Sequence, residues 1–174
     1  MATTTVWAIG DLHLSIGLES EKQKPMDQFG ASWVQHTAKI ARSWCERVQA
    51  QDIVLLAGDI FWGNRVEEAR FALNWLGCLP GRKVLVRGNH DNWWQSIGKV
   101  RAALPPGMYA IQNDALLLDD VAISGARGWT FADPEGPGAS GKNAAPRICA
   151  AGSVACGDVG GRALPHRALA FSAV

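Results

Sequence analysis

Short apolar runs alternate with longer stretches of helical period along the chain through residue 130. Three of the runs have the length and the β-branched content of buried strands, and they cover residues 4–9, 52–56 and 83–87. Apolar residues at helical spacing follow each run, over residues 32–50, 66–76 and 93–104. Strands that alternate with helices in this way are typical of βαβ units. We therefore expect an α/β fold built around a parallel sheet.

Shorter apolar runs follow the helix-breaking sequence Pro105-Pro106-Gly107. They cover residues 109–112, 115–118 and 121–124, and each has the length of a short strand. The last two flank Asp119 and Asp120, which predicts a hairpin turn between two strands.

The composition changes abruptly near residue 134. All eight tryptophans lie at or before Trp129, whereas residues 135–174 contain ten alanines, seven glycines and one aromatic residue, Phe171. This tail has no sustained period of either kind, so we expect residues 134–174 to be an atypical Ala/Gly-rich loop or disordered segment. Its abrupt onset also favours the hypothesis that a frameshift or a premature end in the reading of the gene produced it.

Charge and cysteine content exclude several classes of protein. The 17 basic and 16 acidic residues nearly cancel, which excludes a strongly basic protein that wraps nucleic acid. The four cysteines lack the C-x-x-C spacing of a thiolate zinc site and give no indication of a disulfide framework. The amino terminus lacks a signal-peptide pattern, and no run of about 18 apolar residues occurs. We expect a cytoplasmic protein without a membrane partner, and nucleic acid is not indicated.

Polar residues and glycines follow each of the three predicted buried strands. The sequences are Gly-Asp-Leu-His at 10–13, Gly-Asp at 58–59 and Gly-Asn-His-Asp at 88–91. In a parallel sheet the carboxyl ends of the strands meet at one edge, and ligands bind in the crevice there. Glycine permits the tight turns that such loops need. We expect these loops to bring six side chains together: Asp11, His13, Asp59, Asn89, His90 and Asp91.

These side chains are suited to bind divalent metal ions. Carboxylate, imidazole and amide oxygen ligands together favour manganese, iron or zinc over metals that prefer thiolates. The alternate spacing of Asp11 and His13 lets both side chains point to the same side of an extended backbone. A carboxylate placed between two ions can bridge them.

The three blocks resemble those of the calcineurin-like metallophosphoesterase superfamily, whose pattern begins with D-x-H, G-D and G-N-H-D/E. Each block alone occurs by chance in many proteins, but three in order after three predicted strands form a specific pattern. The surrounding segments resemble a bacterial branch of metal-dependent phosphohydrolases, in the sequences KPMDQFG, GDIFWGNRVEEA and LPGRKVLVRGNHDNWW. The resemblance covers roughly residues 5 to 130.

The resemblance implies a layered β-sheet core flanked by helices over residues 1–133. It also implies a first metal ion bound by Asp11 and His13. Asp59 would bridge this ion to a second one, which Asn89 would bind through its side-chain oxygen. Manganese, iron and zinc are the metals that this pattern implies.

The implied activity is the hydrolysis of a phosphate mono- or diester by a metal-activated hydroxide. His90 would donate a proton to the leaving group or help to hold the phosphate, and Asp91 would orient its ring. The implied partner is a phosphate-ester substrate, whereas the sequence does not identify a protein partner.

Later blocks of the superfamily pattern are missing. The pattern continues with a lone histidine and a G-H-x-H block, but only His166 lies downstream here, in a Leu-Pro-His-Arg context that matches neither. The second metal site would therefore keep only Asp59 and Asn89, and open sites bind metals weakly. An alternative function is a catalytically dead metal-binding or interaction module on the same fold.

Single residues of this set and its neighbours also have common structural roles. An aspartate or asparagine at a strand end is often only a turn former or a helix cap. The adjacent Trp93 and Trp94 have core packing as their more common role, and Arg87 is more often ion-paired or solvated than bound to a phosphate. The segment 136–143 is one residue short of a P-loop, but no apolar strand precedes it and Pro146 interrupts the helix that should follow.

Overall fold

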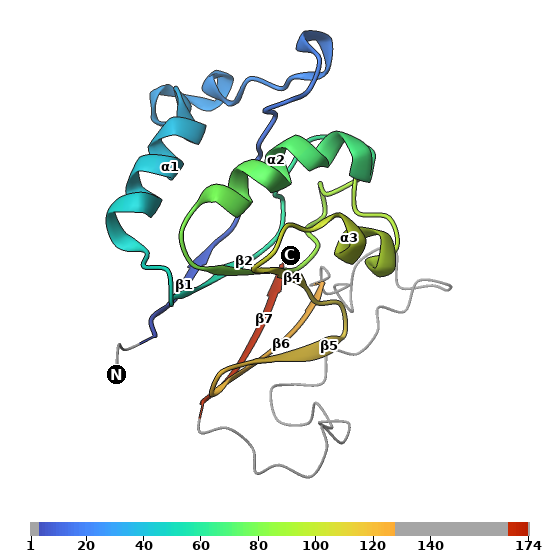
Figure 1. Cartoon of the computed structure of the whole chain (residues 1–174). Helices are drawn as coiled ribbons and strands as arrows, with labels where there is room; N and C mark the ends of the chain where they lie inside the picture. The colour runs from blue at the N-terminus through green and yellow to red at the C-terminus, as the bar shows by residue number, and fades with distance from the viewer. Residues whose placement is uncertain (1–3, 128–166, 174) are drawn as a thin grey trace, which may run out of the picture.

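A parallel four-stranded sheet forms the centre of the computed structural model, which describes residues 4–127 and 167–173 (Figure 1). Its strands lie in sequence order, and each pairs in parallel with the next. They are β1 (Val6–Ile9), β2 (Ile53–Leu56), β3 (Arg82–Leu85) and β4 (Met108–Ala110). The expected α/β fold with a parallel sheet is therefore confirmed.

The three α-helices within residues 4–127 connect consecutive strands of this sheet and lie on the same side of it (Figure 1). Sequential order combined with right-handed crossovers places every connecting helix on one face. The helices are α1 (His36–Arg47), α2 (Val66–Cys78) and α3 (Ile97–Ala103). Short 3-10 turns precede α1 at Ser20–Lys22, Met26–Phe29 and Ala31–Trp33.

Two helices begin later than the apolar spacing predicted. A 3-10 turn occupies Ala31–Trp33, and the left-handed backbone of Gln35 (φ 54°) separates it from α1. The third helix begins after Ser96, whose side chain accepts a hydrogen bond from the Lys99 amide at 3.4 Å and caps it. Apolar periodicity marks the buried face of a segment but does not distinguish a helix from the turns that lead into it.

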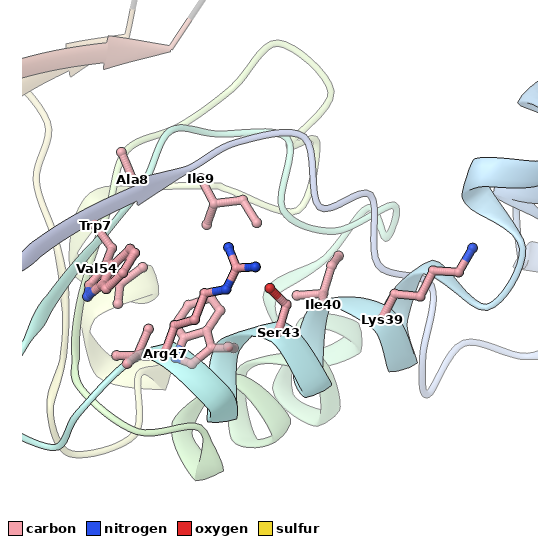
Figure 2. A pocket seen from close by; sticks show the side chains of 10 residues that line it. Trp7, Ala8, Ile9, Lys39, Ile40, Ser43, Arg47 and Val54 are labelled. Carbon is pink, nitrogen blue, oxygen red and sulfur yellow. The ribbon is translucent and has the colours of Figure 1, made fainter.

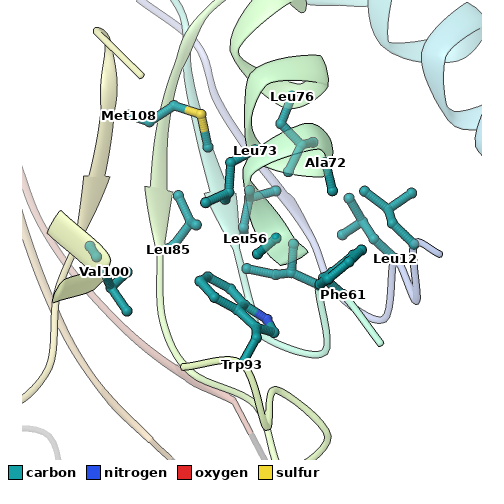
Figure 3. Close-up of a cluster of buried hydrophobic side chains, with 14 of the residues drawn as sticks. Leu12, Leu56, Phe61, Ala72, Leu73, Leu76, Leu85, Trp93, Val100 and Met108 are labelled. Atoms are coloured by element: carbon teal, nitrogen blue, oxygen red, sulfur yellow. The ribbon is translucent and has the colours of Figure 1, made fainter. Parts of the chain in front are cut away.

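Both faces of the parallel sheet are covered, which explains why all four residues of β2 are buried. Val54 and Leu56 face the helices and belong to a cluster that includes the buried side chains in Figure 3. Ile53 and Leu55 face the opposite way and pack in a second cluster with residues of the other sheet. The core thus has two layers of apolar contacts, one on each side of β2.

The second sheet has three strands: β5 (Asp114–Leu118), β6 (Val121–Arg127) and β7 (Arg167–Ala173). The predicted hairpin is confirmed, because β5 and β6 pair antiparallel with Leu118 opposite Val121, and Asp119 in the turn has φ 53°. Asp and Asn tolerate this left-handed conformation better than most residues.

The expectation that the tail contains only loop or disorder is wrong for residues 167–173. This segment pairs in parallel with the whole of β6, from Val121 opposite Arg167 to Arg127 opposite Ala173. Its sequence, RALAFSA, lacks glycine and proline, and its pairing partner lies 46 positions away, so the pattern within the tail gave no signal. The P-loop-like segment 136–143 and His166 lie outside the described residues.

None of the helices in the described ranges is long and apolar enough to cross a membrane.

Strand β3 contains a buried lysine. Lys83 is 2 % exposed, and its ammonium group donates to the carbonyl oxygen of Leu79. Burial lowers the pKa of Lys83 from 10.5 to about 8, since the charged form loses its hydration.

Replacing Lys83 by methionine should stabilise the protein at pH 7 by about 1–2 kcal/mol. The shift of the pKa of Lys83 from 10.5 to about 8 reflects the free energy that burial of the ammonium group costs the native state. Methionine avoids this cost but loses the hydrogen bond to Leu79, which offsets part of the gain in stability. Below pH 8 both states bind the proton and the cost is complete. Between pH 8 and 10.5 the unfolded state binds more protons, so the stability of the native protein rises with pH and the advantage of the variant shrinks.

Urea unfolding of both proteins at pH 7 and pH 10 measures this difference. The exposed Lys99→Met variant is the control, and its free energy of unfolding should change by less than about 0.5 kcal/mol at either pH. A Lys83→Met protein that is less stable than the parent at pH 7 would contradict the prediction.

Candidate metal centre

The loops after β1 and β2 are joined by a ladder of backbone hydrogen bonds. The Asp11 amide donates to the Gly58 carbonyl at 3.1 Å, and the His13 amide donates to the Asp59 carbonyl at 2.9 Å. An isolated bridge between Leu14 and Phe61 extends this pairing beyond the strands. The expected convergence is confirmed for these loops, because one ligand atom each from Asp11, His13 and Asp59 lies within 4.8 Å of the others.

The three residues of this group share an unusual backbone conformation. Asp11, His13 and Asp59 have φ angles of 55°, 45° and 51°, in the left-handed region. This region is unfavourable for most residues with a Cβ atom, by roughly 1–2 kcal/mol each, although aspartate and histidine adopt it more often than the others do. Strain of this kind persists where the surroundings enforce it, and it clusters at functional sites. The fold therefore holds these side chains in positions that local preference would not select.

The donor set fits a divalent cation. His13 Nε2 lies 3.6 Å from Asp11 Oδ1, and the side chains are 13 % and 73 % exposed, so the group faces solvent on the Asp11 side. Burial lowers the pKa of His13, while Asp59 and Asp11 oppose this effect. A neutral imidazole is the form that binds a metal ion. One imidazole and two carboxylates are suited to manganese, iron or zinc.

The loop after β3 lies against the same group. The His90 amide donates to Asp59 Oδ1 at 2.8 Å, which fixes one oxygen of that carboxylate. The imidazole rings of His13 and His90 have their centres 5.8 Å apart. Asn89 and His90 are both exposed. The structure thus places His90 beside the group, whereas its catalytic role and the binding of a second ion by Asn89 stay predictions.

Asp91 is fully buried, and its carboxylate accepts hydrogen bonds from two loops. Its Oδ1 accepts from the amides of Ile60 and Phe61 at 2.8 and 3.3 Å and from the indole of Trp93 at 2.8 Å. Its Oδ2 accepts from the Gly88 amide at 2.8 Å. Burial raises the pKa of Asp91, and these donors oppose the effect. Asp91 therefore ties the loop after β2 to the loop after β3, while its predicted action on the His90 ring is untested.

Trp93 and Trp94 are core residues, as their pairing in the sequence suggested, with exposures of 0 % and 1 %. Arg87 ends the β3 region, and its Nε is buried without a hydrogen-bond partner among the described residues. Burial and the nearby Arg127 lower the pKa of Arg87.

Two residues beside the group were not predicted from the sequence. The Trp62 indole stacks on the His13 ring at 4.6 Å with an interplanar angle of 17°, and Lys24 Nζ lies 4.1 Å from the centre of the Trp62 ring. Both residues occur in segments that carry the family resemblance, but no local pattern marks them. Their proximity depends on the bridge between Leu14 and Phe61, which only the tertiary structure reveals.

Gly88 leaves room for the Asp59 carboxylate. A Cβ atom at position 88 would lie 2.1 Å from Asp59 Oδ1 and 2.2 Å from the Asp59 amide nitrogen, which is far inside contact distance. We expect Gly88→Ala to displace Asp59 and to lower the affinity for Mn²⁺ by at least about tenfold, since supporting residues of metal sites typically contribute 10–100-fold. Calorimetric titration with Mn²⁺ measures this loss.

Gly98→Ala is the matched control for this variant. A Cβ atom there meets nothing within 4 Å, and Gly98 lies inside α3, where alanine is the better helix former. Its Mn²⁺ affinity should equal that of the parent protein. Equal affinities for Gly88→Ala and the parent would show that the Asp59 carboxylate is not a ligand or tolerates the displacement.

A separate pocket of about 380 Å³ lies between β1 and α1 (Figure 2). Trp7, Ile40 and Arg47 are among the residues that line it, and Figure 2 shows the Arg47 side chain extending along it toward β1. It contains none of the six side chains that the sequence predicted for the site. The candidate metal centre, which faces solvent on its Asp11 side, is therefore separate from this pocket.

Comparisons with known proteins extend this description. The "Gene 66 protein" of Mycobacterium phage D29 is 36 % identical over 88 residues, which are 51 % of this chain and 41 % of the phage protein. Its counterpart in phage L5 is 33 % identical over 88 residues, 51 % of this chain and 40 % of that protein. The matched segment thus spans about two fifths of these relatives. A crystal structure of a protein of unknown function from Aquifex aeolicus aligns at 18 % identity with a TM-score of 0.41, covering 78 % of this chain and 67 % of that one.

The match to a protein family covers the region that contains the candidate metal centre. The matching family is described as calcineurin-like phosphoesterase, and the match spans residues 4–135. This range includes every described helix and every strand except β7, and it confirms the resemblance that the strand-end blocks indicated. The chain belongs to the calcineurin-like phosphoesterase family.

Proposed function

We propose that this chain hydrolyses phosphate mono- or diesters with a divalent metal ion held by Asp11, His13 and Asp59. The observation that carries the proposal is the approach of three ligand atoms, one from each residue, within 4.8 Å. Family membership supports the same chemistry, because it indicates a metal-dependent phosphoesterase. The left-handed backbone at all three positions supports a site whose geometry is imposed by the fold.

The residues around the group fit this function. A bound divalent cation supplies positive charge for the phosphoryl oxygens and lowers the pKa of water near it. His90 lies beside His13 and is exposed, so its ring is available to a substrate as a proton donor or as a phosphate contact. Asn89 precedes it in the same loop and offers an amide oxygen to a second ion. We take manganese as the first metal to test, because mixed carboxylate and imidazole ligands suit it.

Hydrolysis of p-nitrophenyl phosphate by the purified full chain tests the proposal. With Mn²⁺ present, we expect release of nitrophenolate above the rate of the metal alone, and we expect EDTA to abolish it. Calorimetric titration with Mn²⁺ tests the metal site independently of turnover. Binding of Mn²⁺ without hydrolysis of either a monoester or a diester would overturn the enzymatic proposal and favour a metal-binding module without turnover. Absence of Mn²⁺ binding would overturn the metal site itself.

A further inference from the structure

Lys24 places a positive charge beside the candidate metal ligands. Its Nζ lies 4.1 Å from the centre of the Trp62 indole. The same indole lies 4.6 Å from the His13 ring and 5.2 Å from the His90 ring, measured between ring centres. These contacts keep the ammonium within roughly one Debye length, about 8–10 Å at physiological ionic strength, of both imidazoles. Its charge therefore acts on any anion bound at the group.

No acidic side chain among the described residues compensates this charge. Within the described residues, 4–127 and 167–173, the Lys24 ammonium group contacts the Trp62 ring and forms no ion pair. Lys22, two positions earlier, is different, because its Nζ lies 3.2 Å from Glu19 Oε2 and 3.3 Å from Glu68 Oε1. Of these neighbouring lysines, Lys24 alone is thus free to attract an anionic ligand.

The segment that carries Lys24 is anchored on both sides. Before it, Lys22 binds Glu68 on α2, and the Gln23 side-chain amide donates to the Leu18 carbonyl at 3.0 Å. After it, Met26 is inserted in the protein with 5 % exposure. These contacts hold the backbone near the site, and the indole then selects the position of the flexible lysine side chain.

We propose that Lys24, held by Trp62, binds the phosphoryl oxygens of the substrate and makes the site prefer phosphate monoesters over diesters. This inference rests on the proposed function of the metal group. At pH 8 a phosphate monoester carries about two negative charges, because its second pKa is about 6, whereas a diester carries one. An uncompensated cation at the rim therefore attracts the monoester more strongly.

The Lys24→Met variant tests this role, because it removes the charge but keeps an unbranched side chain only one atom shorter. With the Mn²⁺-loaded chain at pH 8 and low salt, we expect KM for p-nitrophenyl phosphate to rise about five- to tenfold, the effect of one charge in partly screened surroundings. We expect kcat for this monoester to stay within about twofold, and kcat/KM for bis(p-nitrophenyl) phosphate to change by less than about twofold. Lys24→Arg keeps the charge and the contact with the indole, and it should restore the KM of the parent.

Lys99→Met is the control, because it removes an equal charge from an exposed position on α3, outside the segment that carries Lys24. It should leave both KM values unchanged. An equal rise of KM in Lys99→Met and Lys24→Met would overturn the proposal, since it would indicate a general effect of net charge. An equal loss of activity toward monoester and diester in Lys24→Met would also overturn it.

The contribution of Trp62 can be separated from that of Lys24. Trp62→Phe keeps an aromatic face for the ammonium and should retain the preference for the monoester, whereas Trp62→Leu should lose it. If Trp62→Leu retains the preference, the positioning role of the indole is excluded.

Failure of the proposed hydrolysis is distinguishable from failure of this inference. If the parent chain binds Mn²⁺ but hydrolyses neither ester, the proposed function fails, and calorimetric titration of the Mn²⁺-loaded chain with inorganic phosphate tests Lys24 instead. Phosphate binding that is at least about fivefold weaker in Lys24→Met than in Lys99→Met supports the inference. Equal binding in the two variants, or no phosphate binding by the parent, overturns it.

Discussion

Replacing Asp59 by asparagine should abolish metal-dependent hydrolysis while leaving the fold intact. The Asp59 carboxylate supplies one of the three clustered ligand atoms and lies in a side chain that is only 6 % exposed. Asparagine keeps an oxygen that can accept the hydrogen bond from the His90 amide, so the loop geometry is preserved. It removes the negative charge that holds the cation. We expect Mn²⁺ affinity and kcat/KM to fall by at least about 100-fold, the upper end of what outer partners of a metal site contribute.

Calorimetry with Mn²⁺, hydrolysis of p-nitrophenyl phosphate and circular dichroism together measure this effect. Asp27→Asn is the control, because Asp27 is an exposed acid in a 3-10 turn outside the ligand group. It should match the parent in all three measurements. If Asp59→Asn and the parent hydrolyse the ester equally, the carboxylate of Asp59 is not part of the catalytic group, and the proposed metal site is wrong.

The central sheet could be predicted because its strands are short apolar runs with both faces buried. Each run of this kind has few alternative structures once helices follow it, and β2 is predicted to within a residue. The helix starts were less predictable, since the 3-10 turn at Ala31–Trp33 and the left-handed Gln35 arise from how the chain approaches the sheet. Strand β7 was missed because its pairing with β6 is long-range, and the pattern within seven residues does not reveal a distant partner.

Part of the candidate site could likewise be predicted from the sequence, and part could not. The convergence of Asp11, His13 and Asp59 follows from a topological rule, since residues after neighbouring parallel strands meet at one edge. The rule applies to backbones and gives no information on which side chains fill the space between loops. The position of Trp62 against His13, and of Lys24 against Trp62, depends on side-chain packing across distant segments. The hydrogen bonds of Asp91 likewise depend on two loops whose relative position the sequence does not state.

Asp91 is expected to be the most sensitive buried polar position of the protein's strand-end loops. Its carboxylate accepts one hydrogen bond at Oδ2, from Gly88, and its other oxygen accepts the remaining three. In Asp91→Asn, the single amide oxygen can accept either the bond from Gly88 or the three bonds at the other oxygen, but not both. The NH₂ group then faces N–H donors that have lost their acceptor. We expect the free energy of unfolding to fall by about 2–4 kcal/mol, because buried donors left without partners cost about 1–3 kcal/mol each. Urea unfolding monitored by circular dichroism measures the change.

The comparison with an exposed aspartate decides whether this effect belongs to the buried network. Asp120 lies in the turn between β5 and β6 and is exposed, so Asp120→Asn should change stability by less than about 0.5 kcal/mol. If the two variants are equally stable, the carboxylate of Asp91 does not support the loops. If Asp91→Asn is destabilised as expected, its Mn²⁺ affinity should fall as well. The Asp91 carboxylate holds Gly88 in the loop that carries His90 and Ile60 next to Asp59, so its loss removes an anchor that the two loops share. A native-like Mn²⁺ affinity in a destabilised variant would instead show that the ligand group is held by the ladder between the loops after β1 and β2 alone.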